Sequence, residues 1–141
     1  MQPDNSGPDP QNPAVPQGTG LAPNVAGALS YVLGPVTGVV FVLLERDRFV
    51  RFHAFQSILL AVAWIVFWIG FSIIEALLRF TPALALLVAI IGLLLSLVLG
   101  LGAFILWIAL IIRAYQGSRW KLPVIGDMAE RYAASGTTQP S

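Results

Sequence analysis

The residues of this chain with the most chemical potential are concentrated between positions 45 and 57. Charged, aromatic and hydrogen-bonding side chains gather there, between two long apolar runs. Five of the 15 charged residues of the chain fall between Glu45 and Arg51. We call this stretch the junction motif, and its candidate structural or interaction residues are Arg48, Phe49, Arg51, Phe52, His53, Gln56 and Ser57.

His53 is the only histidine of the chain, and Gln56 and Ser57 follow it at three and four residues. Such spacing places all three side chains on one face of a helix. A histidine at a membrane boundary can relay protons or sense pH, because its reference pKa is about 6.5. The same three side chains can instead satisfy backbone groups at a kink in a neighbouring helix, or contact lipid headgroups or a partner. The sequence leaves these alternatives open.

Other kinds of chemistry find little support. The chain has no cysteine and one histidine, and its carboxylates are scattered, so we expect no metal site within one subunit. No glycine-rich segment is followed by Lys-Ser or Lys-Thr, as a phosphate-binding loop requires. The few basic residues form no long run, which argues against nucleic acid as a partner. We therefore expect a protein without cofactor that is not an enzyme.

The composition indicates lipid as the solvent for most of the chain. Charged residues make up 11% of it, against about 25% in soluble domains. Hydrophobic residues make up 57%, and the 33 positions from Phe80 to Ile112 carry no charge. A surface of this kind cannot be solvated by water, and in lipid the backbone must satisfy its own hydrogen bonds. The prediction is an all-α integral membrane protein.

Three transmembrane helices are predicted to position the junction motif. Their ranges are about 24–44, 54–78 and 83–112. Each is long enough to cross a hydrocarbon core, which takes about 20 residues. Gly34-Pro35 lies near the middle of the first span and predicts a kink, because proline removes a backbone donor and clashes with the preceding turn.

Small residues at a spacing of four suggest how the spans pack. The first span has one such stripe and the third has another. Small side chains allow two membrane helices to approach closely, so we expect the first and third spans to pack face to face. The candidate helix-packing residues are Ser30, Gly34, Gly38, Gly92, Ser96 and Gly100.

The two ends of the chain are predicted to lie outside the membrane domain, which we place at 24–133. Residues 1–23 contain six of the ten prolines and few apolar side chains, which predicts disorder. Asp127 and Glu130 have the spacing of a capping box, which predicts a short interfacial helix over 128–133. Residues 134–141 are expected to be disordered.

The distribution of lysine and arginine predicts orientation. With three spans, seven of these residues fall on one side of the membrane and only Arg79 on the other. The positive-inside rule then places the C-terminus in the cytoplasm and the N-terminus outside. Basic and aromatic residues near the span ends are candidates for contact with lipid headgroups. These are Arg46, Arg113, Arg119, Trp120 and Lys121.

Three segments carry a resemblance to a known family: Ser30-Tyr31 with Gly34-Pro35, the junction from Arg48 to Ser57, and Ala114–Gly117 with Leu122–Asp127. With these residues the chain resembles a family of small, mostly uncharacterised prokaryotic membrane proteins. That family is similar to the twenty-kilodalton subunit of the chloroplast inner-envelope protein import channel (Tic-twenty-like). The resemblance implies a prokaryotic cell membrane as location and, more distantly, protein transport.

From these observations we expect a scaffold or a subunit of a membrane assembly that acts through helix association. Its expected partners are membrane lipids and either its own copies or another membrane protein. The alternative, which rests on the resemblance, is a component of a protein-translocation or channel complex.

Overall fold

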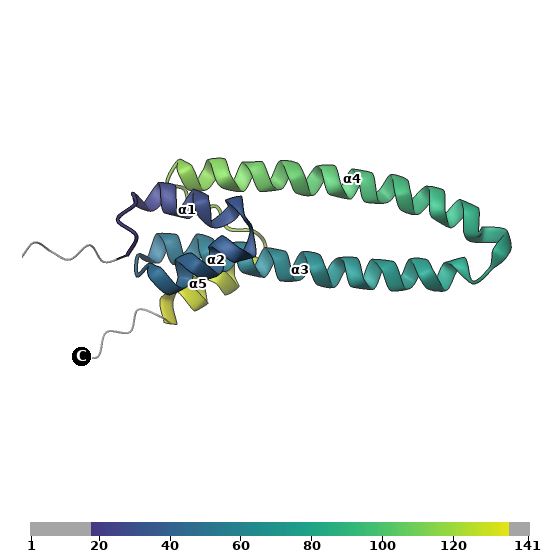
Figure 1. Ribbon diagram of the computed structural model, residues 1–141, viewed down its shortest axis with the longest axis horizontal. Helices are drawn as coiled ribbons and strands as arrows, with labels where there is room; N and C mark the ends of the chain where they lie inside the picture. Colours follow the sequence, from purple (N-terminus) through teal and green to yellow (C-terminus); the bar gives the residue numbers. More distant parts are fainter. Residues whose placement is uncertain (1–17, 136–141) are drawn as a thin grey trace, which may run out of the picture.

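The computed structural model describes residues 18–135, and these fold as an all-α protein (Figure 1). The helices in chain order are α1 (Pro23–Val32), α2 (Pro35–Leu44), α3 (Arg48–Arg79), α4 (Pro82–Tyr115) and α5 (Ile125–Ser135). The predicted fold class is therefore confirmed for the described residues. The number of predicted membrane spans is not.

Helices α3 and α4 form a long hairpin and are, among residues 18–135, the two helices that can cross a membrane. They contain 32 and 34 residues, and both are apolar enough over at least 18 residues to span. At 1.5 Å per residue they are about 48 and 51 Å long, well beyond the roughly 30 Å of a hydrocarbon core. The predicted spans 54–78 and 83–112 lie inside them. Pro82 opens α4 at a position where proline is tolerated.

The prediction of a third span over 24–44 is wrong. This segment folds as α1 and α2, each of 10 residues and about 15 Å long, half of what a span needs. Gly34 separates them with φ +60° and ψ −129°, a conformation that favours glycine. Pro35 then starts α2 without needing a backbone N–H. The Gly34-Pro35 pair thus reverses the chain instead of kinking a continuous helix.

Contacts along α3 fix the directions of the two short helices. Gly27 and Tyr31 of α1 meet progressively later residues of α3, so α1 runs parallel to α3. Residues of α2 meet α3 in the opposite order, with Val42 beside Arg51 and Gly38 beside Ala54. The segment 23–44 therefore enters and leaves at the same end of the hairpin, as Figure 1 shows.

We call this end of the molecule the packed end: α1, α2, α5 and the adjoining ends of α3 (48–59) and α4 (106–115). Its apolar contacts form three clusters. The first joins Tyr31 to Leu110 of α4, the second joins Phe41 to Val50, and the third joins Phe52 to α5. The opposite part, the outer hairpin (residues 65–97), has a single buried residue, Gly92.

The helix at the C-terminal side is longer than predicted. It covers Ile125–Ser135, not 128–133, and lies against the first turns of α3 through Ala129 and Ala133. Asp127 is in its first turn instead of preceding it. Residues 134 and 135, expected to be disordered, belong to this helix.

The described ends of the chain both lie at the packed end (Figure 1). Near the N-terminal side, Thr19 donates hydrogen bonds from its backbone N–H (2.8 Å) and its hydroxyl to the carboxylate of Glu45, which is buried. Residues 18–22 are thus held against the protein, although they fall in the predicted disordered tail. Residues 1–17 and 136–141 of the predicted tails lie outside the described residues. The prediction that the two termini lie on opposite sides of the membrane depended on three spans. With two spans that prediction has no basis.

Candidate functional site

The junction motif begins with the cap of α3. The carboxylate of Asp47 accepts hydrogen bonds from the backbone N–H groups of Phe49 (2.8 Å) and Val50 (3.1 Å). These are donors that the first turn of a helix leaves without a partner in the helix itself. By starting the helix at Arg48, the cap turns His53 and Gln56 toward α1 and Ser57 toward Gly34 of the α1–α2 turn.

Three buried side chains form a hydrogen-bonded group at the centre of the packed end. The hydroxyl of Tyr31 lies 3.1 Å from Nδ1 of His53, and Nε2 of Gln56 donates to the same hydroxyl at 3.0 Å. Because the hydroxyl accepts from Gln56, its own proton is available for Nδ1. In the neutral imidazole the ring proton then lies on Nε2.

The environment of the His53 ring is aromatic and closed. Phe49 and Phe52 contact it edge to face, with ring centroids 4.5 and 5.0 Å away. The ring is fully buried, and Nε2 has no hydrogen-bond partner of good geometry, although the backbone of Ser118 interacts with the imidazole. A Cβ on Gly27 would come within 2.8 Å of Phe49 and 3.3 Å of His53, so glycine is what allows α1 this close.

Gln56 also ties the segment after α4 to α3. Its Nε2 donates to the carbonyl of Trp120 at 3.2 Å, and its Oε1 accepts from the backbone N–H of Leu122 at 3.4 Å. The buried amide thus binds backbone on both sides of Lys121. Through this one side chain, Gln56 links α1, α3 and the segment between α4 and α5.

The backbone groups at the turn between α1 and α2 find partners on the long helices and on α2 itself. Ser57 Oγ donates to the carbonyl of Gly34 at 3.1 Å, and the N–H of Gly38 donates to the same oxygen. Trp107 Nε1 of α4 donates to the carbonyl of Tyr31 at 2.8 Å. Neighbouring groups thus satisfy the backbone at this break between two helices.

The basic residues of the motif have different surroundings. One guanidinium nitrogen of Arg51 donates to the carbonyl of Val42 at 2.9 Å, while the group lies 5.5 Å from the centre of the Phe55 ring. Its Nε is buried without a hydrogen-bond partner. Arg48 is exposed at the packed end. Arg51 therefore joins α2 to α3 instead of facing solvent freely.

The candidate headgroup residues all lie at the packed end, and all are exposed there: Arg46, Arg113, Arg119, Trp120 and Lys121. Arg113 stacks over the ring of Trp120, 5.9 Å from its centre. Lys121 pairs with Glu130 and lies 3.7 Å from Asp127, both on α5. This ion pair raises the pKa of Lys121 and lowers the pKa of Glu130.

The two small-residue stripes do not meet each other. On the first stripe, Ser30 bonds back to the carbonyl of Ala26, and Gly38 receives Ala54 and Ile58 of α3. A Cβ on Gly34 would meet nothing within 4 Å.

On α4, Gly92 receives the carboxylate of Glu75 from α3, Ser96 bonds back to the carbonyl of Leu93, and Gly100 has nothing within 4 Å of where its Cβ would be. Helices α1 and α4 do pack together, but through Ala28, Tyr31, Leu110 and Ala114. The expected face-to-face contact of the stripes is therefore not the contact that the structure shows.

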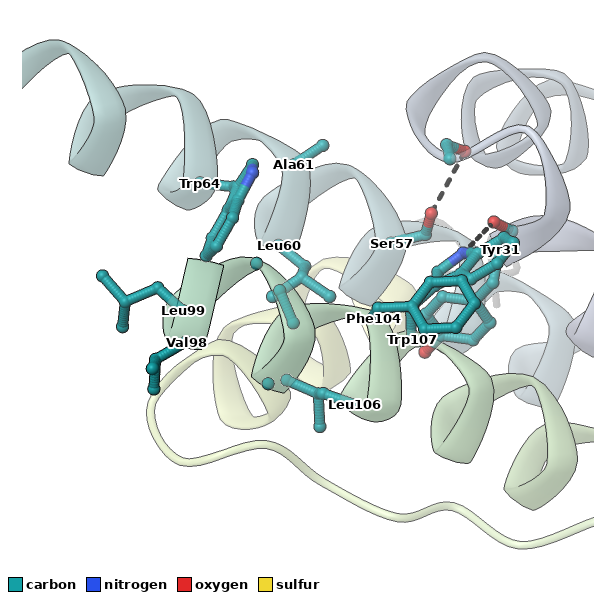
Figure 2. Close-up of a pocket in the computed structure, with 14 residues that line it drawn as sticks. Tyr31, Ser57, Leu60, Ala61, Trp64, Val98, Leu99, Phe104, Leu106 and Trp107 are labelled. Atoms are coloured by element: carbon teal, nitrogen blue, oxygen red, sulfur yellow. Dashed lines mark hydrogen bonds between the residues drawn. The ribbon is translucent and has the colours of Figure 1, made fainter. Parts of the chain in front are cut away.

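A pocket of about 730 Å³ opens between α3 and α4, next to the packed end (Figure 2). The side of the pocket nearest the packed end, which we call its inner side, is lined by Tyr31, Gly34, Ser57 and Trp107. Its remaining walls come from residues 60–64 of α3 and 98–106 of α4, and they are apolar.

Comparison with known proteins places the chain in a family. A family model described as the magnetosome magnetite crystal formation protein family matches residues 19–129, most of the chain. The chain belongs to this family. Among its relatives is a UPF0132 membrane protein from Archaeoglobus fulgidus, 45% identical over 109 residues, which cover 77% of this chain and 92% of the relative. A UPF0132 membrane protein from Methanocaldococcus jannaschii is 43% identical, over 81% of this chain and 91% of that protein.

These relatives establish a membrane protein of an uncharacterised family. A second Methanocaldococcus jannaschii protein of the same description is 40% identical over 80% of this chain and 71% of its own length. No solved structure matches the chain significantly. The comparisons give no support to the more distant relation with the chloroplast import channel.

Two members of the site were not among the candidates drawn from the sequence. Tyr31 was noted only as part of the family resemblance, and Trp107 was not singled out. Tyr31 carries a signal that was available, because a tyrosine in an apolar segment needs a partner for its hydroxyl when buried. Trp107 sits within an uninterrupted apolar run, where nothing distinguishes it from a tryptophan that faces lipid.

Proposed function

We propose that this protein is a non-catalytic integral membrane protein that acts as a scaffold or subunit of a membrane assembly. The observation that carries the proposal is the exposure of the outer hairpin. Residues 65–97 form two helical arms with one buried residue between them, so their apolar side chains are available to lipid and to other helices. Leu86 and Leu97, for example, are 73% and 61% exposed.

The internal bonding of the junction motif supports a structural role over catalysis. Tyr31, Gln56 and Ser57 use their polar atoms on one another and on the backbone of the packed end. Buried polar networks of this kind fix a unique arrangement of helices. No group of three or more histidine, aspartate or glutamate residues among positions 18–135 is placed to hold a metal ion. The proposal includes neither an enzymatic activity nor a role of this chain in holding a metal.

We further propose that the packed end faces the cytoplasm of a prokaryotic cell. Seven lysines and arginines lie at or beside this end: Arg46, Arg48, Arg51, Arg113, Arg119, Lys121 and Arg131. Arg79 is at the opposite turn, where it pairs with Glu75 at 2.6 Å. By the positive-inside rule both described ends then lie in the cytoplasm. In this arrangement α1 and α2 form a hairpin on the cytoplasmic side.

Protein translocation stays the alternative function. Two long helices from one chain enclose little space, so a pathway would need several copies around a common axis. The scaffold and translocation proposals differ in what the outer hairpin touches in native membranes: fixed partner helices in the first case, and precursor chains in transit in the second.

Photo-crosslinking in native membranes tests the proposal. A photoreactive residue at Leu86 of the outer hairpin is expected to capture the same protein partner, or a second copy, in each preparation. The matched control is the same residue at Val62, 51% exposed on α3 outside the outer hairpin. Adducts with lipid alone from Leu86, together with only monomer in native mass spectrometry, would refute the assembly. Capture of secretory precursors would favour translocation.

A further inference from the structure

The pocket between α3 and α4 has the properties of a lipid-chain site. We propose that it holds an acyl chain of a lipid from the leaflet at the packed end. This inference does not depend on the proposed assembly, because it concerns the space inside one chain's hairpin. Its volume of about 730 Å³ falls within the range of small-molecule sites in proteins, roughly 300–1,000 Å³.

The chemistry of the walls selects an apolar occupant. Leu60, Ala61, Val98 and Leu99 present only hydrocarbon to the pocket (Figure 2). The polar groups at the inner side are already bonded within the protein. Ser57 Oγ donates to Gly34, and the indole of Trp107 donates to the backbone of Tyr31.

An entering molecule would therefore find few polar atoms that need a partner. An apolar chain makes no hydrogen bonds to water and so loses none on entering, whereas a polar ligand would lose its hydrogen bonds to water without replacing them.

The volume favours a slender chain over a helix from another protein. A helix with its side chains is about 10–12 Å across, so it occupies roughly 80–110 Å³ per ångström of length. The pocket would then hold only about 6–9 Å of helix, less than two turns. An acyl chain is much thinner and bends at each bond, so it can follow the pocket between the helices.

The position of the pocket along α3 matches the level where the headgroup of a lipid meets its acyl chains. On α3 it extends from Trp64 to Ser57, which lie 16 and 23 positions from Phe80 at the hairpin turn. These positions are about 24 and 35 Å from the turn along the helix. If the turn marks one edge of a hydrocarbon core of about 30 Å, the pocket crosses the other edge. Its apolar wall then lies in the hydrocarbon, and its polar inner side lies at the headgroup level.

Two glycines offer a way to fill the pocket without harming the fold. Gly100 and Gly102 line it, and a Cβ at either position would meet nothing within 4 Å. Leucine is also a better helix former than glycine. The variant Gly100→Leu with Gly102→Leu should thus keep the helix and occupy space that the acyl chain needs. Gly70→Leu is the matched control, since Gly70 is equally open but lies outside this pocket.

The experiment places the full-length protein in vesicles of phosphatidylethanolamine and phosphatidylglycerol with a small fraction of phosphatidylglycerol that carries a diazirine in one acyl chain. After illumination, adducts are mapped by peptide mass spectrometry. We expect adducts on Leu99 and Ala103 above the level at exposed Leu86. In the double variant these pocket adducts should fall about fivefold or more, because overpacking typically costs enough for that change. Gly70→Leu should leave them unchanged.

Three results would overturn the proposal. One is labelling of the pocket residues no stronger than that of Leu86. Another is labelling that the double variant and Gly70→Leu change to the same extent. The third is capture of a second copy of the protein from pocket positions, which would show that a helix fills the space. Far-ultraviolet circular dichroism of each variant verifies that the helices are retained.

Discussion

The hydroxyl of Tyr31 lies 3.1 Å from Nδ1 of His53, although the two residues are 22 positions apart in the chain. Tyr31 is on the last turns of α1, and His53 is on the second turn of α3. This pair, with Gln56 bonded to the same hydroxyl at 3.0 Å, fixes the depth of the α1–α2 hairpin against the long helices. The junction motif thus holds the α1–α2 hairpin in place.

Tyr31→Phe should destabilise the packed end. The substitution keeps the ring but leaves Nδ1 of His53 without its partner and removes one of the two acceptors of Gln56 Nε2. A buried polar group that loses its partner costs about 1–3 kcal/mol. The expected result is a lower midpoint of thermal unfolding in mild detergent.

Tyr115→Phe is the matched control for this substitution. Its side chain is 61% exposed at the end of α4, so the same loss of a hydroxyl should change the midpoint little. Equal midpoints for Tyr31→Phe and Tyr115→Phe would show that the buried hydroxyl does not stabilise the fold.

Gly34→Ala distinguishes the α1–α2 hairpin from a continuous span. With φ +60° and ψ −129°, Gly34 has a backbone conformation that costs other residues about 1–3 kcal/mol. A Cβ there would meet nothing within 4 Å, so the cost is conformational and not steric. We expect a lower unfolding midpoint for this variant.

The matched control for that experiment is Gly100→Ala, since Gly100 is inside α4 and equally open. Alanine is the better helix former by about 1 kcal/mol, so this control should be neutral or stabilising. If residues 24–44 formed one helix, Gly34→Ala would behave like the control. A stabilised Gly34→Ala variant would therefore contradict the turn.

The membrane class and the two long spans were predictable because they depend on composition and length, which the sequence shows directly. The predicted span over 24–44 failed at Gly34-Pro35. A run of 21 uncharged residues has the length of a span whether or not the chain reverses in its middle. What decides between the two outcomes is whether α3 and α4 supply partners for the freed backbone, as Ser57 and Trp107 do. Such tertiary contacts are not visible in a local pattern.

The site was predictable in part for the same reason. His53, Gln56 and Ser57 stood out because polar groups are rare in this chain, and all three are buried at the packed end. Their partners were not predictable, since Gln56 bonds to Trp120 and Leu122, more than 60 positions away. The prediction from the small-residue stripes failed because Gly92 accommodates Glu75 of α3 and not the stripe on residues 24–44.

Labelling of single cysteines should show both described ends on one side of the membrane. The chain has no cysteine of its own, so each introduced residue gives an unambiguous signal. Leu21→Cys and Met128→Cys are exposed positions at the packed end, and Phe80→Cys is at the opposite turn with 84% exposure. A membrane-impermeant maleimide added to intact cells should label only Phe80→Cys, and after lysis it should label all three.

Three spans would give a different pattern in that experiment. Leu21→Cys would then react in intact cells while Met128→Cys would not. Labelling of Leu21→Cys alone or together with Phe80→Cys in intact cells would thus refute the placement of both described ends on one side.

The pair of Lys121 and Glu130 should make the attachment of α5 depend on pH. The hydrogen bond of this pair lowers the pKa of Glu130 below the ordinary 4.5. The stability that ionised Glu130 adds to the attachment of α5 is therefore complete above pH 4.5 and is lost as the pH falls through the lowered pKa. The same bond raises the pKa of Lys121 above 10.5, so that contribution is complete below pH 10.5 and is lost only at higher pH.

Between these limits, Lys121→Gln should speed hydrogen exchange of the α5 amides, after correction for the intrinsic rate at each pH. The effect should be modest and should shrink in high salt, because both side chains are exposed. Arg131→Gln, at an exposed cation of the same helix, should have a weaker effect. Below the lowered pKa of Glu130, Lys121→Gln and the unmodified chain should exchange alike. A difference that persists there unchanged would mean that Lys121 holds α5 by packing and not by charge.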